Sequence, residues 1–338
     1  MTNRFLLRLV VPLLHRNKGE RTMNTATLTQ APARPMSRAA VWWLAARPHT
    51  LGLSAMPVLA GCALAWHQGA APRWGVALLA LLSAICIQIG TNLLNDVGDF
   101  ERGADGPDRQ GPLRATAQGL LTPHEVRCAG LGALAAAFVL GVPLVWLGGW
   151  PIVILGLLSL VCGWGYTSGP HPIAYGSLGE VFVWVFFGVA AVAGVCWLQG
   201  APLNAATFWM GHILGTLAAA VMLVNNTRDM PTDAAAGRCT LAVRMGRRGC
   251  NVLYAVLLAQ PYLAWPLLYK AQPIQAWTML TLPWALWLVV RFARHPGGQA
   301  LNVLLARTVR LQMGWVAVLL LGLLTEHFVL QPRLFIIR

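Results

Sequence analysis

Long apolar runs, separated by short polar or basic stretches, make up most of this chain. A helix needs about 20 mainly apolar residues to cross a bilayer. Nine runs approach or reach that length, and the fourth is the shortest: 51–67, 74–95, 124–146, 150–166, 180–198, 206–226, 250–269, 275–292 and 309–330. The pattern predicts an all-α integral membrane protein built as a bundle of nine transmembrane helices.

The composition agrees with a chain that lies mostly in lipid. Of 338 residues, 57% are hydrophobic and only 11% are charged, whereas soluble domains carry about 25% charged residues. No linker long enough to separate domains interrupts the apolar runs. We therefore expect one membrane domain, 39–332, preceded by a basic cytoplasmic tail, 1–38, that is disordered.

The basic residues indicate how the chain is oriented. If the N-terminus is cytoplasmic, all of the 25 Lys and Arg residues lie on the inner side except Arg73, Lys270, Arg333 and Arg338. Cytoplasmic loops of membrane proteins carry such an excess. We expect a multi-pass protein of the inner (plasma) membrane with a cytoplasmic N-terminus. The net charge of +14 then reflects topology and an anionic substrate, and no nucleic-acid partner is expected.

The seven cysteines are scattered and form no CxxC pair, so neither a disulfide framework nor a zinc site is indicated. The aspartates, by contrast, are concentrated. All six lie in two windows: Asp96, Asp99, Asp105 and Asp108 follow the second apolar run, and Asp229 and Asp233 follow the sixth. A carboxylate at the bilayer centre costs about 2.5–3.5 kcal/mol, and both runs end on the predicted cytoplasmic side. This placement calls for a functional cause.

The spacing of the acids supplies that cause. Asn92, Asp96 and Asp99 fall at i, i+4 and i+7, on one face of a helix. The second window repeats the pattern with Asn226, Asp229 and Asp233 if its helix continues. Two such faces would offer the oxygen ligands that Mg²⁺ prefers. We predict that Mg²⁺ is the cofactor and that its catalytic ligands are Asp96, Asp99, Asp229 and Asp233. Asp105 and Asp108 are equally well explained as solvated loop acids.

Arginines surround both windows and suit phosphate oxygens, which guanidinium groups bind in pairs. Topology alone would also place arginine here. We predict a substrate-binding set made of Asn92, Asn95, Arg102, Arg109, Arg114, Tyr175, Asn226, Arg228 and Arg238. Acids for a metal beside arginines for phosphate indicate a diphosphate substrate bridged by Mg²⁺.

The same residues resemble a known family. The segment 92–105 looks like the first aspartate-rich motif of UbiA-type aromatic prenyltransferases, and 225–233 with 237–244 looks like the second. The continuation 108–114 is similar to the 1,4-dihydroxy-2-naphthoate branch. Further matches at 47–50, 169–175, 179–180, 186–188 and 305–312 extend the resemblance over about 40–330. Val97 and Gly98 depart from the aromatic residues often found between the first acids, and Arg238 replaces a usual lysine.

The resemblance implies a nine-helix bundle with a central cavity and a Mg²⁺-dependent prenyl transfer. The donor would be a polyprenyl diphosphate held at the lipid bilayer, and the acceptor dihydroxynaphthoate, which loses CO₂ and gives a precursor of menaquinone. Arg109 or Arg114 could pair with the acceptor's carboxylate, and Val97 and Gly98 would leave room for its rings. Two alternatives stay open: another branch acting on 4-hydroxybenzoate, homogentisate or another aromatic acceptor, and a cation transporter. Transporters place their acids near the bilayer midplane, whereas both acid windows lie at the predicted cytoplasmic ends of their helices.

Overall fold

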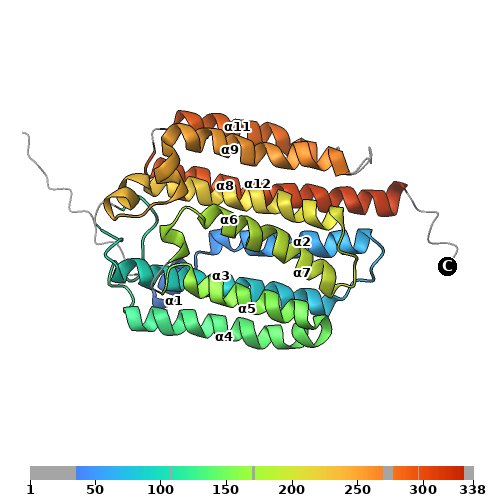
Figure 1. The fold of residues 1–338 in the computed structure, drawn as a ribbon, viewed down its shortest axis with the longest axis horizontal. Helices are drawn as coiled ribbons and strands as arrows, with labels where there is room; N and C mark the ends of the chain where they lie inside the picture. Colours follow the sequence, from blue (N-terminus) through green and yellow to red (C-terminus); the bar gives the residue numbers. More distant parts are fainter. Residues whose placement is uncertain (1–35, 107–108, 170–171, 269–276, 296, 331–338) are drawn as a thin grey trace, which may run out of the picture. The chain divides into compact units, whose positions relative to one another are not determined.

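The described part of the chain is all-helical. A computed structural model describes residues 36–106, 109–169, 172–268, 277–295 and 297–330, and within them it contains no β-strand. The longer helices lie side by side (Figure 1). Their bounds are α1 Arg38–Ala46, α2 Gly52–His67, α3 Trp74–Glu101, α4 Pro123–Gly148, α5 Trp150–Gly165, α6 Gly179–Trp184, α7 Ala190–Leu198, α8 Ala205–Ala235, α9 Leu241–Leu268, α11 Leu282–Arg294 and α12 Ala300–Thr325.

Short helical pieces join or extend these helices. The 3₁₀ turns are η1 Pro48–Thr50, η2 Ile173–Tyr175 and η4 Met279–Thr281. Two π-helical segments, η3 Val185–Val189 and η5 Glu326–Leu330, follow α6 and α12. Because α6, η3 and α7 run on without a gap, they act as one rod, Gly179–Leu198.

Helices occupy each of the nine expected ranges within the described residues, but the span count is lower by stricter criteria. Five are long and apolar enough to cross a membrane, namely α3, α4, the α6–α7 rod, α8 and the α12 helix, and a sixth is added if the bent pair α1 and α2 counts as one span. The apolar α5 has only 16 residues. The chain is therefore a multi-pass helical protein, and α1 is an element that the apolar pattern did not predict.

Local sequence explains where the key helices begin and end. Thr122 and Glu125 form a capping box at the start of α4, and the Asn204 side chain accepts from Ala206 and Thr207 at the start of α8. Such caps satisfy backbone N–H groups that have no partner inside the helix. At their other ends, α3 and α8 continue beyond the apolar runs, so Asp96, Asp99, Asp229 and Asp233 are helical, whereas Asp105 lies in the loop after α3.

Helix α8 lies at the centre of the bundle. In its apolar stretch 78% of residues are buried, and it packs against α9, α12, α2 and the α6–α7 rod. Gly188 of η3 allows the closest approach, because a Cβ there would lie 2.4 Å from the Gly211 carbonyl oxygen and 2.5 Å from Gly215 Cα. Small residues commonly let membrane helices pack this closely.

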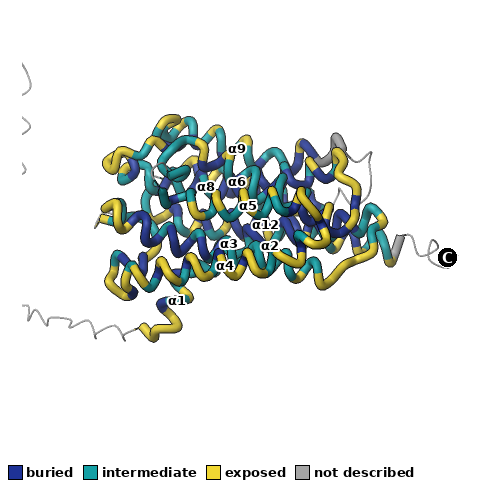
Figure 2. The backbone as a smooth tube through the Cα atoms, turned by 60° about the horizontal axis from the view of Figure 1, so that its bottom comes forward, coloured by how far each residue is buried: buried dark blue, intermediate teal, exposed yellow. Residues whose placement is uncertain are grey.

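Helices α4 and α5 form an outer face that contrasts with α8. Only 22% of the apolar stretch of α4 is buried, and its trace in Figure 2 is coloured mainly as exposed and intermediate. The largest exposed apolar groups there include Phe138, Val139, Trp146, Ile154 and Val161. Apolar surface of this extent is stable against lipid rather than water.

Candidate active site

Arg238 brings the two acid windows together. Its Nη2 donates to Asp99 Oδ1 on α3 at 2.7 Å, and its Nη1 donates to Asp233 Oδ1 on α8 at 3.3 Å. Nη2 also donates to the Tyr175 hydroxyl at 2.9 Å, and the guanidinium stacks 4.1 Å from the Tyr175 ring centroid. Acids 134 positions apart in the chain thus bind the same guanidinium.

A second arginine holds the first window from the loop side. Arg114 Nη2 donates to Asp99 Oδ2 at 2.8 Å and to Asn95 Oδ1 at 2.9 Å. Its Nε lies 3.6 Å from Asp105 Oδ2, and Asp105 also pairs with Arg109. Asp99 is therefore a buried carboxylate with a guanidinium on each oxygen.

Asp96 has different partners from Asp99. Its Oδ2 accepts from the Ala115 backbone at 3.0 Å, and its Oδ1 accepts from the Thr116 backbone at 3.4 Å and from the Thr116 hydroxyl. Both oxygens thus anchor the returning loop. Because these donors are backbone and hydroxyl groups, Asp96 holds the loop that carries Arg109 and Arg114.

The second window is more open. Arg228 binds both oxygens of Asp229, at 2.8 Å and 2.5 Å, and also donates to Asn225 and Asn302 Oδ1. Asn302 in turn donates to the Gln110 carbonyl at 3.0 Å, which ties α12 to the first loop. The Asp229 side chain stays 17% exposed, against 6% for Asp99.

Arg102 and Asn92 make contacts with the backbone. Arg102 donates to the carbonyls of Thr167 at 2.6 Å and Gly169 at 2.7 Å, which holds the turn before Tyr175. Asn92 Nδ2 donates to the Ala46 carbonyl at 3.0 Å, at the break between α1 and α2. Both residues therefore shape the walls of the site.

Arg47 stands at that break in a left-handed conformation, with φ 55°, which costs a residue with a side chain about 1–3 kcal/mol. Its carbonyl accepts from Thr50 N and Oγ1. The guanidinium makes no hydrogen bond to another described residue, while its charge interacts with Arg109, Asp96, Asp99 and Arg228. The motif at 47–50 pointed to this residue, although the predicted site did not include it.

Glu180 also belongs to the site and was left out of the predicted set. Asn226 Nδ2 donates to Glu180 Oε1 at 2.9 Å. The other carboxylate oxygen of this buried acid has no partner within the described residues. An unsatisfied buried acceptor of this kind is available to a ligand donor.

Burial and charge shape the titration of the loop groups. Burial raises the pKa of Asp105 to about 6, although Arg109 opposes the change. Burial lowers the pKa of Arg238, but Asp99, Tyr175 and Asp233 outweigh it and hold the pKa above its usual value. Burial also raises the pKa of Tyr175. The guanidinium at the centre of the site therefore stays charged.

One expectation needs correction, and another stays a prediction. Val97 and Gly98 do not leave room for a ligand: Val97 is buried, and a Cβ on Gly98 would lie 2.9 Å from the Thr167 carbonyl oxygen. The predicted metal-ligand set stays a prediction: within the described residues no group of three or more Asp, Glu, His or Cys side chains is arranged to hold a metal, and Arg238 stands between Asp99 and Asp233. Asp108 lies outside the described residues.

The donor set nevertheless suits a hard cation. Asp99, Asp229 and Asp233 provide carboxylate oxygens of the type that Mg²⁺ prefers. One monovalent guanidinium already joins Asp99 and Asp233, so a positive charge between the windows is stabilising. The residues present therefore fit a magnesium ion, provided that Arg238 yields its place or shares it.

A polytopic helical membrane protein with an acid–arginine site at one end of the bundle defines the class, and comparison identifies the family. Residues 54–311 match the UbiA prenyltransferase family, and the chain belongs to it.

Relatives and solved structures agree with this assignment. A 1,4-dihydroxy-2-naphthoate octaprenyltransferase of Mycobacterium tuberculosis is 39% identical over 66% of this chain and 76% of its own. The Escherichia coli enzyme of that name is 35% identical over 81% and 92%. The solved structure of a UbiA homolog from Archaeoglobus fulgidus bound to DMAPP and Mg²⁺ shares the fold, with a TM-score of 0.57 and 15% identity over 82% of this chain and 99% of that one.

Proposed function

We propose that this chain transfers a polyprenyl group from its diphosphate to 1,4-dihydroxy-2-naphthoate, with loss of CO₂, as a step toward menaquinone. Its similarity to two enzymes named for that activity supports the acceptor. One geometric observation carries the chemistry: Arg238 joins the acids of α3 and α8 in a buried cluster that also holds Arg114 and Arg228. Such a cluster suits a diphosphate.

The reaction has a simple balance. The allylic C–O bond of the donor breaks, and its electron pair leaves with the diphosphate. The ring carbon that carries the acceptor's carboxylate forms the new C–C bond, and the carboxylate leaves as CO₂. The protein must therefore stabilise negative charge on the leaving group and keep water away from the allylic cation.

Asp99, Asp229 and Asp233 are the proposed holders of Mg²⁺. Its chemistry there is neutralisation of the charge that builds on the departing diphosphate. We assign Asp96 to positioning the loop, because both of its oxygens already accept from Ala115 and Thr116. The archaeal homolog whose structure contains DMAPP and Mg²⁺ supports this choice of cofactor.

The arginines divide the remaining work. Arg238 and Arg228 stand beside the acids and would turn to the diphosphate oxygens. Arg102 and Asn92 fix the walls, through the 167–169 carbonyls and the α1–α2 break. Tyr175 presents a ring that can stabilise the cation, since a π face attracts positive charge.

The acceptor's carboxylate needs a cationic partner. Arg109 and Arg114 were the first candidates, but both pair with Asp105. Arg47 is the better candidate, because its guanidinium has no hydrogen-bond partner among the described residues while its charge lies near Asp96 and Asp99. We therefore propose that Arg47 receives an anionic group of a substrate.

The proposed topology has nine spans, a cytoplasmic N-terminus and the site on the cytoplasmic side. The distribution of basic residues supports this orientation. We also propose that 1–38 is a tail that catalysis does not require. Labelling of a cysteine placed near Asp105 from the outer side of intact cells would overturn the orientation.

The decisive experiment uses membranes that contain the protein, with Mg²⁺, a prenyl diphosphate and either dihydroxynaphthoate or 4-hydroxybenzoate. We expect the naphthoate to be prenylated with loss of CO₂, detected by product mass. EDTA should abolish the activity and Mg²⁺ should restore it. Preferential prenylation of 4-hydroxybenzoate with its carboxylate retained would overturn the acceptor assignment and leave the diphosphate chemistry intact.

A further inference from the structure

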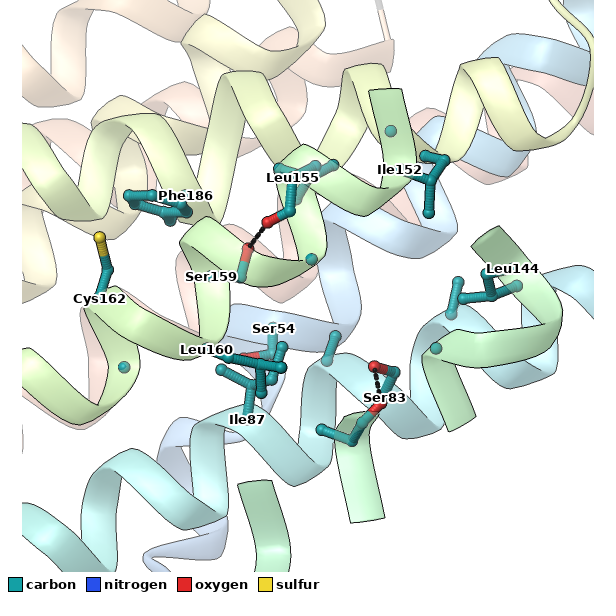
Figure 3. Close-up of a pocket in the computed structure, with 18 of the residues that line it drawn as sticks. Ser54, Ser83, Ile87, Leu144, Ile152, Leu155, Ser159, Leu160, Cys162 and Phe186 are labelled. Carbon is teal, nitrogen blue, oxygen red and sulfur yellow. Dashed lines mark hydrogen bonds between the residues drawn. The ribbon is translucent and has the colours of Figure 1, made fainter. Parts of the chain in front are cut away.

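Charged side chains outside the acid cluster are distributed unevenly over the bundle. The apolar cavity of about 490 Å³ between α2, α3, α4, α5 and the α6–α7 rod has no charged residue in its lining among the described residues. Its Ser83 and Ser159 hydroxyls donate to the Ala137 and Leu155 carbonyls, at 3.1 Å and 2.7 Å (Figure 3). The exposed arginines in the described C-terminal half lie instead on α9, α11 and α12.

Two arginines from different helices stack on Trp287, which is itself exposed. Arg291 of α11 places its Cζ 5.4 Å from the centroid of the indole ring, and Arg307 of α12 places its Cζ 4.8 Å from it. Arg294 and Arg310 each follow three positions later, so each shares a helix face with the arginine before it. All four arginines are exposed, and together with Trp287 we call them the α11–α12 basic face.

No carboxylate offsets the charge of this face. Among the described residues, none of its four arginines forms an ion pair. Between 234 and 338 the chain has 11 Lys and Arg residues and one acid, Glu326. Glu326 lies 16 positions beyond Arg310, about 24 Å along a helix at roughly 1.5 Å per residue. Any anion that pairs with these arginines therefore comes from outside the described chain.

The helix dipole explains only half of the basic face. A positive charge is stabilised at a helix C-terminus, and Arg291 and Arg294 lie in the last turn of α11. Helix α12 begins at Ala300, so Arg307 and Arg310 lie beyond its first turn. Because the dipole acts within the first and last turns, it gives these two arginines no reason to be there.

The position of Arg307 and Arg310 along α12 suits the headgroup level of a bilayer. They border the expected apolar run 309–330, and Ala300–Phe328 is long and apolar enough to cross a membrane. An exposed guanidinium is costly deeper in the hydrocarbon, whereas at this level it can bind phosphate oxygens in pairs. Basic clusters between membrane helices bind anionic headgroups in this way, and tryptophan is enriched at membrane interfaces.

We propose that the α11–α12 basic face binds the phosphate headgroup of an anionic phospholipid, with Arg291 and Arg307 as its direct partners. Exposed apolar side chains flank the face, Leu286 and Val290 on α11 and Met313 on α12, and offer a surface for the acyl chains. The headgroup neutralises arginines of two helices at once and so stabilises their contact. This binding goes beyond the proposed reaction and does not depend on it.

The same end of α12 reaches the acid cluster. Arg228 Nη1 donates to Asn302 Oδ1 at 2.8 Å, and Asn302 Nδ2 donates to the Gln110 carbonyl at 3.0 Å. Asn302 lies five positions before Arg307. A lipid that stabilises α11 against α12 therefore also stabilises a wall of the site, and its binding should raise the melting temperature of the protein.

The test uses the full chain in detergent, titrated with phosphatidylglycerol or with phosphatidylcholine of the same acyl chains while the melting temperature is followed. We expect only phosphatidylglycerol to raise the melting temperature of the wild type. In Arg291→Gln/Arg307→Gln its apparent affinity should fall about 30-fold, at roughly fivefold for each arginine near an anionic headgroup. Trp287→Leu keeps both charges but removes the ring that holds them, so it should lower the affinity by a smaller factor.

Arg244→Gln/Arg248→Gln is the matched control, because it removes two exposed arginines of α9 and the same amount of charge. It should keep the wild-type affinity. Inorganic phosphate should not replace the lipid, because it lacks the acyl chains. The proposal is overturned if the folded Arg291→Gln/Arg307→Gln variant binds phosphatidylglycerol as the wild type does, if the control loses as much affinity, or if inorganic phosphate stabilises the wild type equally.

Discussion

The two acid windows occupy one site but differ in how firmly the protein holds them. In the first window, Asp96 accepts hydrogen bonds from the loop, and Asp99 has a guanidinium on each oxygen. Asp105 is almost fully buried between Arg109 and Arg114. In the second, the Asp233 carboxylate has one hydrogen-bond partner among the described residues, Arg238 at 3.3 Å, and Asp229 pairs with its own neighbour Arg228 and is partly exposed.

This difference indicates a division of labour. A carboxylate that anchors backbone N–H groups cannot turn to a metal without loss of the loop, whereas one held by a side chain can exchange its partner. The carboxylates of the first window mainly hold the loop and its arginines in position, whereas those of the second are mainly available to bind a ligand. Substitutions in the two windows should therefore fail in different ways.

The largest effect is expected for loss of a ligand carboxylate. Asp233→Asn should lower turnover more than about 100-fold, since metal stabilisation of the leaving group contributes several kcal/mol. Thermal stability should change little, because Asp233 has a single bond. Glu101→Gln is the control, as this acid pairs with Arg127 at the surface. Near-normal turnover of purified Asp233→Asn would remove Asp233 from the metal site.

Arg238, which joins the two acid windows, provides the next prediction. Arg238→Gln leaves Asp99 and Asp233 facing each other, and breaking a buried pair costs about 3–5 kcal/mol. The melting temperature in detergent should fall, and Mg²⁺ should raise it more than in the wild type, because the ion would replace the missing charge. Arg244→Gln, at an exposed position nearby, should behave like the wild type. If Mg²⁺ raises the melting temperature of Arg238→Gln no more than that of the wild type, the ion and the Arg238 guanidinium do not share one position.

The third prediction tests whether Asp96 positions the loop or binds the metal. In Asp96→Asn the side chain keeps one oxygen as an acceptor, but its new NH₂ group faces a backbone N–H, so that two donors meet. This change should lower the free energy of unfolding by about 1–2 kcal/mol. We expect faster tryptic cleavage of the loop at Arg109 or Arg114 and a loss of turnover of only about tenfold, the low end for a residue that orients others. If turnover falls as far as in Asp233→Asn while the loop stays protected, Asp96 is a metal ligand after all.

The sequence predicted where most of the helices lie, because each apolar run overlaps a helix, but α3, α8, α9 and α12 extend beyond their runs and α1 was not predicted. Helical spacing also grouped Asp96 with Asp99 on one helix face and Asp229 with Asp233 on another, and in the structure Arg238 pairs with one acid of each group. The sequence could not show that Ala115 and Thr116 return to Asp96, since that depends on how the loop folds back. The αL conformation of Arg47 and the early start of α12 at Ala300 depend on tertiary contacts that no local pattern encodes.

The smallest effect is expected at Asp105, a loop acid whose side chain is only 1% exposed. Its pKa rises to about 6 because burial disfavours the charged carboxylate, so the folded protein binds this proton more strongly than the unfolded chain does. The resulting stabilisation is complete below the unfolded pKa of 3.8 and is lost as pH rises through 6. Between pH 5 and pH 7 the loss is on the order of 1 kcal/mol.

Asp105→Asn has no such proton, so its melting temperature should fall less than that of the wild type over this interval, when both are measured without substrate. The difference between the two curves therefore reports the titration of Asp105 together with its electrostatic coupling to Asp99 and Asp96. Parallel curves would show that Asp105 is already ionised at pH 5, held in that state by Arg109 and Arg114, and that the first window is as charged as the second.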